Sequence, residues 1–372
     1  MRIVLFCHSL VSDWNHGNAH FLRGVVAELQ ARGHDVGVHE PVDGWSRANL
    51  VVEHGPEAVE EFHRAFPPLR SGVYDRRDGV DQLVEGADLV VVHEWNDPEL
   101  VAELGRRRRH HGYRLLFHDT HHRAVTSPAA MARYDLTGYD GVLAFGRVLR
   151  DLYLERGWAA RAWTWHEAAD VRVFHPLPGV ARRGDLVWIG NWGDGERTAE
   201  LQEFLVGPVR RLGLAAQVYG VRYPAEATAA LAEAGIRHGG WRANHRAPAA
   251  FAAHAVTVHV PRRPYTEALP GIPTIRPFEA LACGIPLVCS PWDDAEGLFR
   301  PGEDFLMAGD GRQMERHLDD VLHDPDLAAS LRSHGLETVL ARHTCAHRVD
   351  ELLDVCRELG LAPDATALGT RA

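Results

Sequence analysis

The sequence is short of cysteine, of positive charge and of long apolar runs. Its 372 residues include five cysteines, none in a CxxC pair, and Cys7, Cys283 and Cys289 lie in apolar surroundings typical of a core. No stretch reaches the roughly 18 apolar residues of a membrane span. The start has one early basic residue and too short an apolar run for a signal peptide. We therefore expect a cytoplasmic protein without disulfides and without an integral membrane segment.

The charge balance excludes one broad class of partners. The formal net charge is −11 at pH 7, whereas general nucleic-acid binders need an excess of Lys and Arg for phosphate contacts. The densest basic run, residues 106–111, ends a predicted helix, where cations favour the helix dipole and point to water. We expect no nucleic-acid partner, and local groups must bind any anionic ligand.

The length, the composition and the hydrophobic pattern predict two α/β domains. The length exceeds that of a typical single core, and 45% hydrophobic with 24% charged residues is close to the globular average. Short apolar runs alternate with amphipathic stretches, as in parallel sheets covered by helices on both faces. Strands are expected at residues 2–8, 35–39, 88–94, 113–119, 141–146 and 161–167, and again at 185–192, 215–221, 255–262, 286–290 and 304–309. The Pro- and Gly-rich segment 171–185 predicts the linker.

Five polar segments follow expected strands, where open α/β sheets bind ligands. The first, residues 12–20, leads into a helix whose free N–H groups can receive an anion. Gly17 would let the backbone approach a ligand, and His16 and His20 are candidates for the acceptor side. GxGxxG and Walker A patterns are absent, so this is not a dinucleotide or P-loop site. An ordinary helix-entry turn explains the same residues.

The second segment, residues 118–123, holds three imidazoles and a carboxylate. These are zinc and manganese ligands, but adjacent loop residues rarely converge on one ion, so we predict no metal site and leave the question open for 118–122. Neutral imidazole can donate to a sugar or phosphate oxygen. His118 is therefore a candidate acid/base or hydrogen-bonding group, with His121 on the acceptor side. Structural loop histidines are the alternative.

The third segment, residues 165–170, approaches the HExxH zinc signature but has Asp170 in place of the second His. The signature needs both ligands on one helix face. Because this stretch follows an apolar strand and enters the linker, it predicts a hinge-side segment and not a metalloprotease.

The fourth segment, residues 189–198, is a glycine-rich turn before a helix. Such a turn can present N–H groups to a diphosphate, with Asn191 in the turn and Arg197 adding a guanidinium. Capping of the helix by Thr198 would explain half of the pattern without a ligand.

The fifth segment, residues 270–288, is the most specific. A Gly/Pro turn opens a short helix that begins near Thr274 and Ile275 and bears Arg276 and Glu279, and a turn at 284–286 leads directly into a buried strand. A carboxylate there can accept hydrogen bonds from both ribose hydroxyls of a nucleotide. The alternative for Glu279 is an acidic residue stabilised by the helix dipole.

The run Arg-x-Phe-Glu-Ala-Leu-Ala-Cys-Gly-x-Pro at 276–286 resembles the donor-binding signature of GT-B glycosyltransferases. The sequence resembles in particular the GT4-like retaining enzymes and the CgeB (YkvP)-like group, and residues 170–176 and 188–191 also match. The resemblance implies two doubly wound Rossmann-like domains facing a central cleft. Residues 1–170, with a C-terminal helix at about 345–372 crossing back, would hold the acceptor, and residues 171–344 the nucleotide sugar.

The resemblance also implies roles for single residues. Glu279 matches the ribose-binding carboxylate, Gly17 the glycine near the phosphates, and His118 the histidine that contacts the transferred sugar. Two positions depart from the pattern. Gly271 stands where retaining families have a second glutamate, with Glu267 as a possible displaced substitute. No lysine follows Arg197, and Arg276 is the candidate for the missing charge.

Together these features predict a nucleotide-sugar-dependent glycosyltransferase that acts on a small-molecule or glycan acceptor, with retention. Arg276, Arg197 and the amides near Thr274 would stabilise the leaving diphosphate without an essential metal or other cofactor. The alternatives are a catalytically weak GT-B binding protein for spore or envelope assembly, and a GT-B epimerase. The donor, the acceptor and the oligomeric state stay open.

Overall fold

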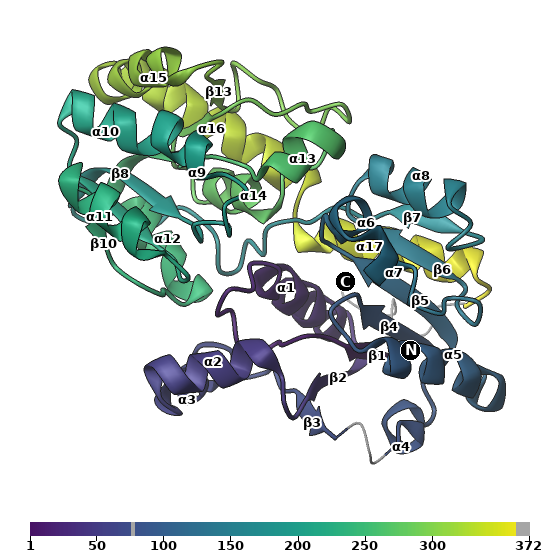
Figure 1. Cartoon of the computed structure of the whole chain (residues 1–372). Coiled ribbons are helices and arrows are strands. Elements are labelled where there is room, and N and C mark those ends of the chain that lie inside the picture. The colour runs from purple at the N-terminus through teal and green to yellow at the C-terminus, as the bar shows by residue number, and fades with distance from the viewer. Residues whose placement is uncertain (76–78, 362–372) are drawn as a thin grey trace, which may run out of the picture. The chain divides into compact units, whose positions relative to one another are not determined.

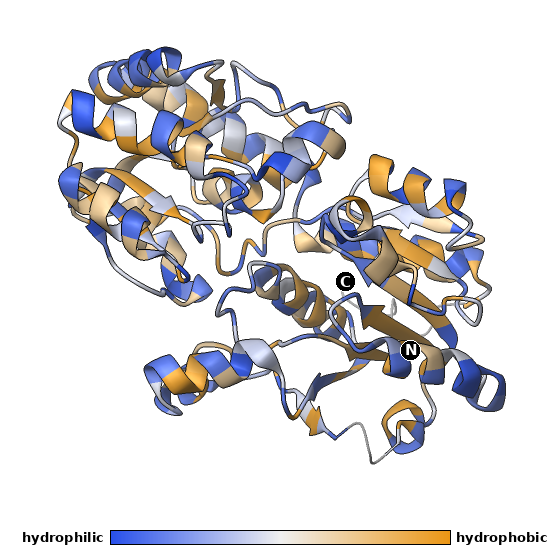
Figure 2. Ribbon diagram, viewed as in Figure 1, coloured by the Kyte–Doolittle hydropathy of each residue, from blue (hydrophilic) through white to orange (hydrophobic). Residues whose placement is uncertain are grey.

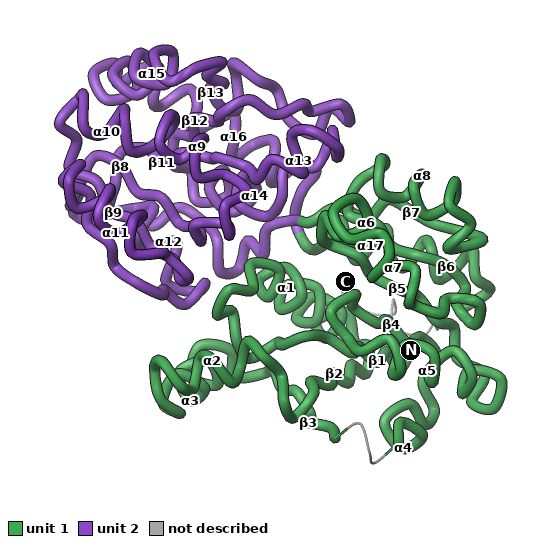
Figure 3. The backbone as a smooth tube through the Cα atoms, viewed as in Figure 1, with its two compact units in different colours: residues 1–167, 345–372 green, residues 168–344 purple. Residues whose placement is uncertain are grey.

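The computed structural model describes residues 1–75 and 79–361. The chain divides into two compact units (Figure 3): unit 1 comprises residues 1–167 and 345–372, and unit 2 comprises residues 168–344. The C-terminal helix expected at about 345–372 is found as α17 (Cys345–Glu358), and residues 362–372 of that expectation lie outside the described residues.

Unit 1 is built on a parallel sheet. Its described residues form seven strands in the order β3-β2-β1-β4-β5-β6-β7 (Figure 1). They are β1 (Arg2–Phe6), β2 (Asp35–Pro41), β3 (Gly72–Tyr74), β4 (Leu89–His93), β5 (Arg114–Asp119), β6 (Gly141–Ala144) and β7 (Ala162–Thr164). Figure 2 shows apolar residues gathered along the central strands, in keeping with helices on both faces. The strand order reverses between β1 and β4, which makes this the position where such sheets bind ligands.

Helices connect these strands. They are α1 (Ala19–Ala31), α2 (Trp45–His54), α3 (Glu57–Ala65), α4 (Asp81–Val84), α5 (Pro98–His111), α6 (Arg123–Thr126), α7 (Pro128–Met131) and α8 (Arg147–Glu155). Helix α5 shows how the sequence sets the boundaries: Asp97 caps its start, and Gly112 ends it in the left-handed conformation. Its basic run is not only a solvated surface, because Arg107 pairs with Asp81 at 3.0 Å.

Helix α17 completes unit 1 although it follows unit 2 in the chain. It packs against α1, where Arg32 donates to the carbonyl oxygen of Ala346 at 3.1 Å and pairs with Asp350. The indole of Trp165 donates to the carbonyl oxygen of Arg348 at 2.7 Å. These contacts attach the end of the described chain to the first unit.

Unit 2 repeats the architecture. Its sheet has six described parallel strands in the order β10-β9-β8-β11-β12-β13. The strands are β8 (Gly184–Ile189), β9 (Ala216–Tyr219), β10 (Arg237–His238), β11 (His254–His259), β12 (Leu287–Cys289) and β13 (Leu306–Met307). All six residues of β11 are buried, so this central strand is covered on both faces. The predicted α/β class with two doubly wound Rossmann-like units is confirmed.

The helices of unit 2 lie between and after these strands. They are α9 (Thr198–Leu201), the π-helical turn Gln202–Val206, α10 (Gly207–Leu212), α11 (Ala225–Glu233), the 3₁₀ turn Asn244–Arg246, α12 (Ala247–Ala252), α13 (Arg263–Ala268), α14 (Ile275–Ala282), α15 (Gly311–His323) and α16 (Pro325–Arg342). Helix α14, which carries the most specific sequence pattern, packs against α16, β11 and β12.

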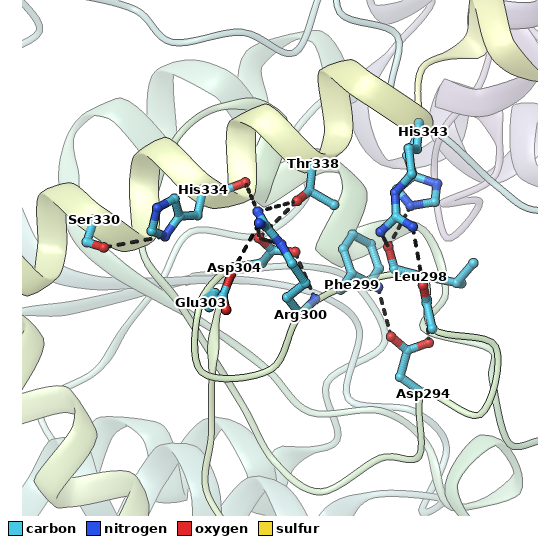
Figure 4. A network of polar contacts seen from close by, with 12 residues as sticks. Asp294, Leu298, Phe299, Arg300, Glu303, Asp304, Ser330, His334, Thr338 and His343 are labelled. Carbon is cyan, nitrogen blue, oxygen red and sulfur yellow. Dashed lines mark hydrogen bonds and ion pairs between the residues drawn. The ribbon is translucent and has the colours of Figure 1, made fainter.

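A buried polar network fixes the long connection after β12 to α16 (Figure 4). The fully buried carboxylate of Asp304 accepts from Arg300 at 2.7 Å and from Thr338 of α16 at 2.9 Å. Asp294 accepts from two backbone amides of the same connection, at 2.8 and 3.0 Å. His343, just after α16, contacts the carbonyl oxygen of Leu298 at 2.8 Å. The connection therefore has a fixed course, which matters for the residues that it carries.

Candidate functional site

The glycine-rich turn after β8 has a backbone that few side chains allow. Gly193, Asp194 and Gly195 have φ angles of 95°, 53° and 85°, three consecutive residues in the left-handed region. The side-chain oxygen of Asn191 accepts from the amide of Val221 at 2.9 Å, which holds the turn against the loop after β9. Asn191 therefore stabilises the turn, and its predicted role in binding the nucleotide sugar stays a prediction.

Arg197 lies at the end of this turn, partly buried between the ends of β8 and β11. Its guanidinium donates to the carbonyl oxygens of Val260 and Asn191 and lies 5.1 Å from the ring centre of Trp188. Its Nε atom has no hydrogen-bond partner among the described residues. Burial, followed by the positive charge of Arg262, lowers the pKa of Arg197 to about 9, and Tyr223 opposes this shift. Burial and Arg262 therefore disfavour the charged form of Arg197, and an anion would stabilise it.

His259 ends β11 beside this guanidinium. Its Nδ1 atom is buried and has no partner among the described residues. Burial, followed by the positive charges of Arg197 and Arg276, lowers the pKa of His259 to about 3. Two guanidinium groups and a neutral imidazole therefore come together at the carboxyl ends of the central strands, and Arg197 Nε and His259 Nδ1 have no hydrogen-bond partner among the described residues. Such a group is suited to an anion.

Helix α14 begins next to this group in an unusual backbone conformation. Thr274, immediately before the helix, has φ 61° and ψ −178°, a region that is costly for a residue with a branched side chain. Ile275 is the first helical residue. Arg276 and Glu279 form an ion pair within the helix, and Glu279 is fully buried. The helix places backbone amides, a guanidinium and a carboxylate within its first two turns.

Gly271 stands where the sequence pattern has a glutamate, and the structure places another glutamate beside it. Gly271 has φ 86°, and a Cβ atom at this position would lie 2.7 Å from Cγ and 3.0 Å from Oε1 of Glu296. Glu296 comes from the connection after β12, which Asp294 and its amide contacts fix. Glu267, the substitute suggested by the sequence, is exposed on α13. The carboxylate beside Gly271 is therefore that of Glu296.

In unit 1, a buried carboxylate shapes the loop after β1. Glu40, near the end of β2, accepts from the hydroxyl of Ser9 at 2.8 Å and from the amides of Leu10 and Val11 at 2.8 and 3.0 Å. It is 1% exposed. Three charge-assisted hydrogen bonds therefore fix the loop before its predicted ligand-binding part begins.

Arg23 of α1 holds the same loop from the other side. It donates to the carbonyl oxygen of Leu10 at 2.7 Å and pairs with Asp13 at 2.8 Å. Its guanidinium lies 4.8 Å from the ring centre of Phe62 and 5.1 Å from that of Phe66. The loop is thus rigidly connected to the first helix, as a preorganised binding loop requires.

The predicted residues of this loop differ in position. Gly17 is exposed just before α1, and its φ is not in the left-handed region, so the structure gives no backbone reason for glycine there. His20 is buried in the first turn of α1, and His16 is 6% exposed. Asn18, a residue that the sequence did not single out, donates to Glu167 at 2.9 Å. This contact connects the loop to the end of unit 1.

Three histidines form a buried cluster at the carboxyl ends of the central strands. The ring centres of His16 and His93 are 6.1 Å apart, and those of His93 and His118 are 5.3 Å apart. His93 and His118 are register partners in β4 and β5. Among the described residues, His16 Nε2, His93 Nδ1 and His118 Nε2 lack a hydrogen-bond partner. We call these three residues the imidazole cluster.

Burial keeps the imidazole cluster neutral at pH 7. It lowers the pKa of His118 to about 3. It also lowers the pKa values of His93 and His16, each of which is further lowered by neighbouring histidines. Neutral imidazole has one donor and one acceptor nitrogen. The cluster can therefore hydrogen-bond to hydroxyl groups.

The segment after β5 is a structural turn as well as a candidate site. Asp119 accepts from the amide of His121 at 3.0 Å and from the hydroxyl of Tyr153 at 2.7 Å, and His122 contacts Thr126 at 3.0 Å. Within residues 1–75 and 79–361, no group of three or more His, Cys, Asp or Glu side chains is arranged to hold a metal ion.

A buried ion pair follows β4 and was not anticipated. Glu94 is fully buried and pairs with Arg123, whose guanidinium lies 4.1 Å from the ring centre of Trp95. Burial raises the pKa of Glu94, and the adjacent Arg123 opposes that shift. The pair fixes the position of Trp95.

The segment 165–170 is not helical in the structure. Glu167 accepts from Asn18, and Ala169 forms an isolated parallel bridge with Thr344. A zinc signature on one helix face is therefore absent from this segment, in agreement with the prediction from its sequence.

Comparisons with known proteins agree with this architecture. Residues 197–354 match a family model described as glycosyl transferase-like, and no curated protein matches the chain. In the described residues no helix is long and apolar enough to cross a membrane.

Solved structures match over nearly the whole chain. Sucrose-phosphate synthase from Thermosynechococcus elongatus has a TM-score of 0.66 at 16% identity, with 98% of this chain and 100% of that chain covered. HepE from Anabaena, in complex with UDP and glucose, has a TM-score of 0.65 at 14% identity, with 96% and 100% covered. A glycosyltransferase from Rickettsia africae has a TM-score of 0.68 at 11% identity, with 97% and 99% covered. The chain therefore has the GT-B fold of two Rossmann-like units, and residues 197–354 carry the pattern of the glycosyl transferase-like family.

Proposed function

We propose that the protein is a glycosyltransferase that moves a sugar from a nucleotide-sugar donor to a small-molecule or glycan acceptor. The observation that carries the proposal is the basic group of unit 2. Among the described residues, the buried Nε atom of Arg197 and the buried Nδ1 atom of His259 beside it have no hydrogen-bond partner. A diphosphate would supply the negative charge and the acceptor oxygens that these donors lack. HepE, which has the same fold, binds UDP-glucose.

The donor site then follows from the elements around this group. Arg197 and Arg276 bind the diphosphate together with the amides at Thr274 and Ile275, which stabilises the leaving group as its charge grows. Glu279 binds the ribose. These fixed cations replace a metal, so the reaction needs no essential metal and no other cofactor.

The sugar side uses different residues. Glu296, beside Gly271, supplies a carboxylate for the hydroxyls of the donor sugar, in place of the exposed Glu267. His118 is the proposed catalytic group of unit 1, because Nε2 of its neutral ring has no hydrogen-bond partner in the described part of the chain. Retention of configuration, and kinship with the CgeB-like group, rest on the sequence pattern around Glu279.

The cysteines bear on the cellular compartment of the enzyme, and the net charge bears on its partners. All five cysteines are free and buried, which supports a reducing compartment such as the cytoplasm. One structure of the same fold, an alpha-glucosyltransferase, contains UDP and DNA. A net charge of −11 argues against a DNA acceptor for this chain.

A panel of UDP-, GDP- and dTDP-sugars tests the proposal. At least one donor should raise the melting temperature and release its nucleotide slowly in water, with EDTA having no effect. Glu279→Ala should weaken nucleotide binding. Failure of every donor to shift the melting temperature or release nucleotide would refute the proposal.

A second candidate is a GT-B protein that binds a nucleotide sugar without turning it over. The observation that favours it is Gly271, which lacks the carboxylate expected at that position. Saturable binding of a donor with no released nucleotide over many hours, with a range of acceptors present, would support this candidate over the enzyme.

A further inference from the structure

A row of aromatic rings lies along the carboxyl edge of the unit 1 sheet. It consists of Trp45 at the start of α2, His8 after β1, Trp95 after β4 and His121 after β5. The ring centre of His8 is 5.8 Å from that of Trp45 and 6.3 Å from that of Trp95, and Trp95 is 5.0 Å from His121. We call these four residues the aromatic platform.

The two indoles of the platform are unusually exposed. Trp45 is 43% exposed and Trp95 is 42% exposed, and no other Trp, Tyr or Phe among the described residues is as exposed. Large apolar rings that face water beside a ligand-binding edge mark a binding surface more often than a folding requirement. Arg123 covers one side of Trp95, so this indole is held in place.

The imidazole cluster continues the platform into the unit. The ring of His8 lies 5.1 Å from that of His16, which is the first member of the cluster. Three cluster nitrogens have no hydrogen-bond partner within residues 1–75 and 79–361, and pairing them requires groups that can both donate and accept. Hydroxyl groups meet this requirement.

Two cations next to the platform are paired with carboxylates. Arg123 pairs with Glu94, and Arg23 pairs with Asp13 at 2.8 Å. A carboxylate or phosphate ligand would find no unpaired cation in these two pairs. Stacking rings combined with neutral hydrogen-bonding groups suit a ligand that has apolar ring faces and many hydroxyls.

We propose that the aromatic platform binds the acceptor and that the acceptor is a neutral carbohydrate. The proposal rests on the glycosyltransferase function proposed above and names the substrate class of its acceptor. The indoles of Trp45 and Trp95 stack on sugar ring faces, and His8 with the imidazole cluster hydrogen-bonds to hydroxyls. In the transfer, a hydroxyl oxygen of this carbohydrate forms the new glycosidic bond, its proton is released, and the nucleoside diphosphate departs with the electrons of the broken bond.

The test measures binding of neutral oligosaccharides to the full chain by ligand-observed NMR. The probes are maltotetraose, cellotetraose and chitotetraose, with polygalacturonate as an anionic glycan and quercetin as a planar phenol. At least one neutral oligosaccharide should bind, and Trp45→Ala should weaken it roughly two- to tenfold. Trp95→Phe should retain most of the affinity because a ring remains. Preference for quercetin or polygalacturonate over every neutral oligosaccharide would overturn the proposal.

A matched control separates stacking from a general effect of losing an indole. Trp163 is a partly buried residue of β7 in the same unit, and its Nε1 donates to Glu358 at 2.8 Å. Trp163→Ala should leave oligosaccharide binding unchanged. An equal loss of affinity in Trp163→Ala and Trp45→Ala would contradict the platform.

Donor hydrolysis distinguishes failure of this proposal from failure of the function. Release of nucleotide into water needs no acceptor, so the wild-type protein should hydrolyse its donor whether or not an oligosaccharide binds. Normal hydrolysis without oligosaccharide binding would overturn the platform and leave the glycosyltransferase intact. Oligosaccharide binding that depends on Trp45, without any donor binding, would leave a carbohydrate site and remove the transferase.

Discussion

Replacing Arg197 with methionine should separate the stability of the free protein from its affinity for a diphosphate. Burial, with the positive charges of Arg262 and Arg276, lowers the pKa of Arg197 to about 9, which corresponds to a penalty on the charged form on the order of 5 kcal/mol. Its hydrogen bonds to the carbonyl oxygens of Val260 and Asn191 offset about 1.5–3 kcal/mol each. The two effects nearly cancel. Arg197→Met should therefore change the unfolding free energy of the free protein by less than about 2 kcal/mol.

The liganded protein should respond differently. A diphosphate at a hundred times its Kd stabilises the wild type by about 2.7 kcal/mol. For a unit the size of residues 168–344, this is a rise of about 5–10 °C in melting temperature. Losing charged hydrogen bonds to the diphosphate should lower affinity roughly ten- to hundredfold. About half of the rise should then disappear for a tenfold loss, and nearly all of it for a hundredfold loss, at the same concentration of UDP or of the nucleotide that the panel identifies.

The assay is thermal unfolding with and without nucleotide, supported by calorimetric titration. Arg210→Met is the matched control, because Arg210 is exposed on α10; it should leave both measurements unchanged. If Arg197→Met lost several kcal/mol of stability without ligand yet bound nucleotide normally, Arg197 would be a structural residue. The assignment of the basic group as an anion site would then be wrong.

Three further outcomes are expected. Glu296→Gln should lower kcat at least tenfold in the transfer assay, whereas Glu267→Gln should change it less than twofold; equal effects would contradict the assignment. Gly271→Ala should lower the unfolding free energy in urea by about 1–3 kcal/mol, because φ is 86° and the Cβ would contact Glu296. Burial lowers the pKa of His118 to about 3, so as the pH drops the unfolded state binds a proton before the folded state does. The unfolding free energy should therefore fall between about pH 6.5 and pH 3, by up to roughly 1.4 kcal/mol per pH unit. His118→Gln should reduce that slope in denaturation series at pH 4.5 and 7.

The fold could be predicted from the sequence because its strands are buried on both faces. Leu-Val-Val-Val-His in β4 is a continuous apolar run with all five residues buried, which is the pattern of a parallel strand. The edge strands were harder. β3 has two exposed residues out of three, and both residues of β10 are exposed. An edge strand is defined by pairing with a neighbour, and its own sequence carries little hydrophobic signal.

The candidate site was predictable only where one segment carries it. The fifth segment places Arg276 and Glu279 on one helix at spacing i, i+3, so their ion pair follows from local geometry. His93 was not singled out, because its position beside His118 depends on the register of β4 and β5. Arg23 belongs to the same class, since only the fold brings it to the loop after β1. The roles of the predicted site residues stay predictions until the variants are measured.

Glu296 shows why a departure from a sequence pattern need not remove a chemical group. In a parallel sheet, the loops after neighbouring strands converge on one edge, so a carboxylate can reach the same space from a different loop. Here Gly271 lacks a side chain and adopts a φ of 86°, and Cγ of Glu296 occupies the space that a Cβ would need. The two features depend on each other, because a side chain at 271 would displace Glu296. We therefore expect Gly271→Glu to restore the sequence pattern but lower activity, unless Glu296→Ala is introduced with it. Full activity of the single Gly271→Glu variant in the transfer assay would show that the two positions are independent.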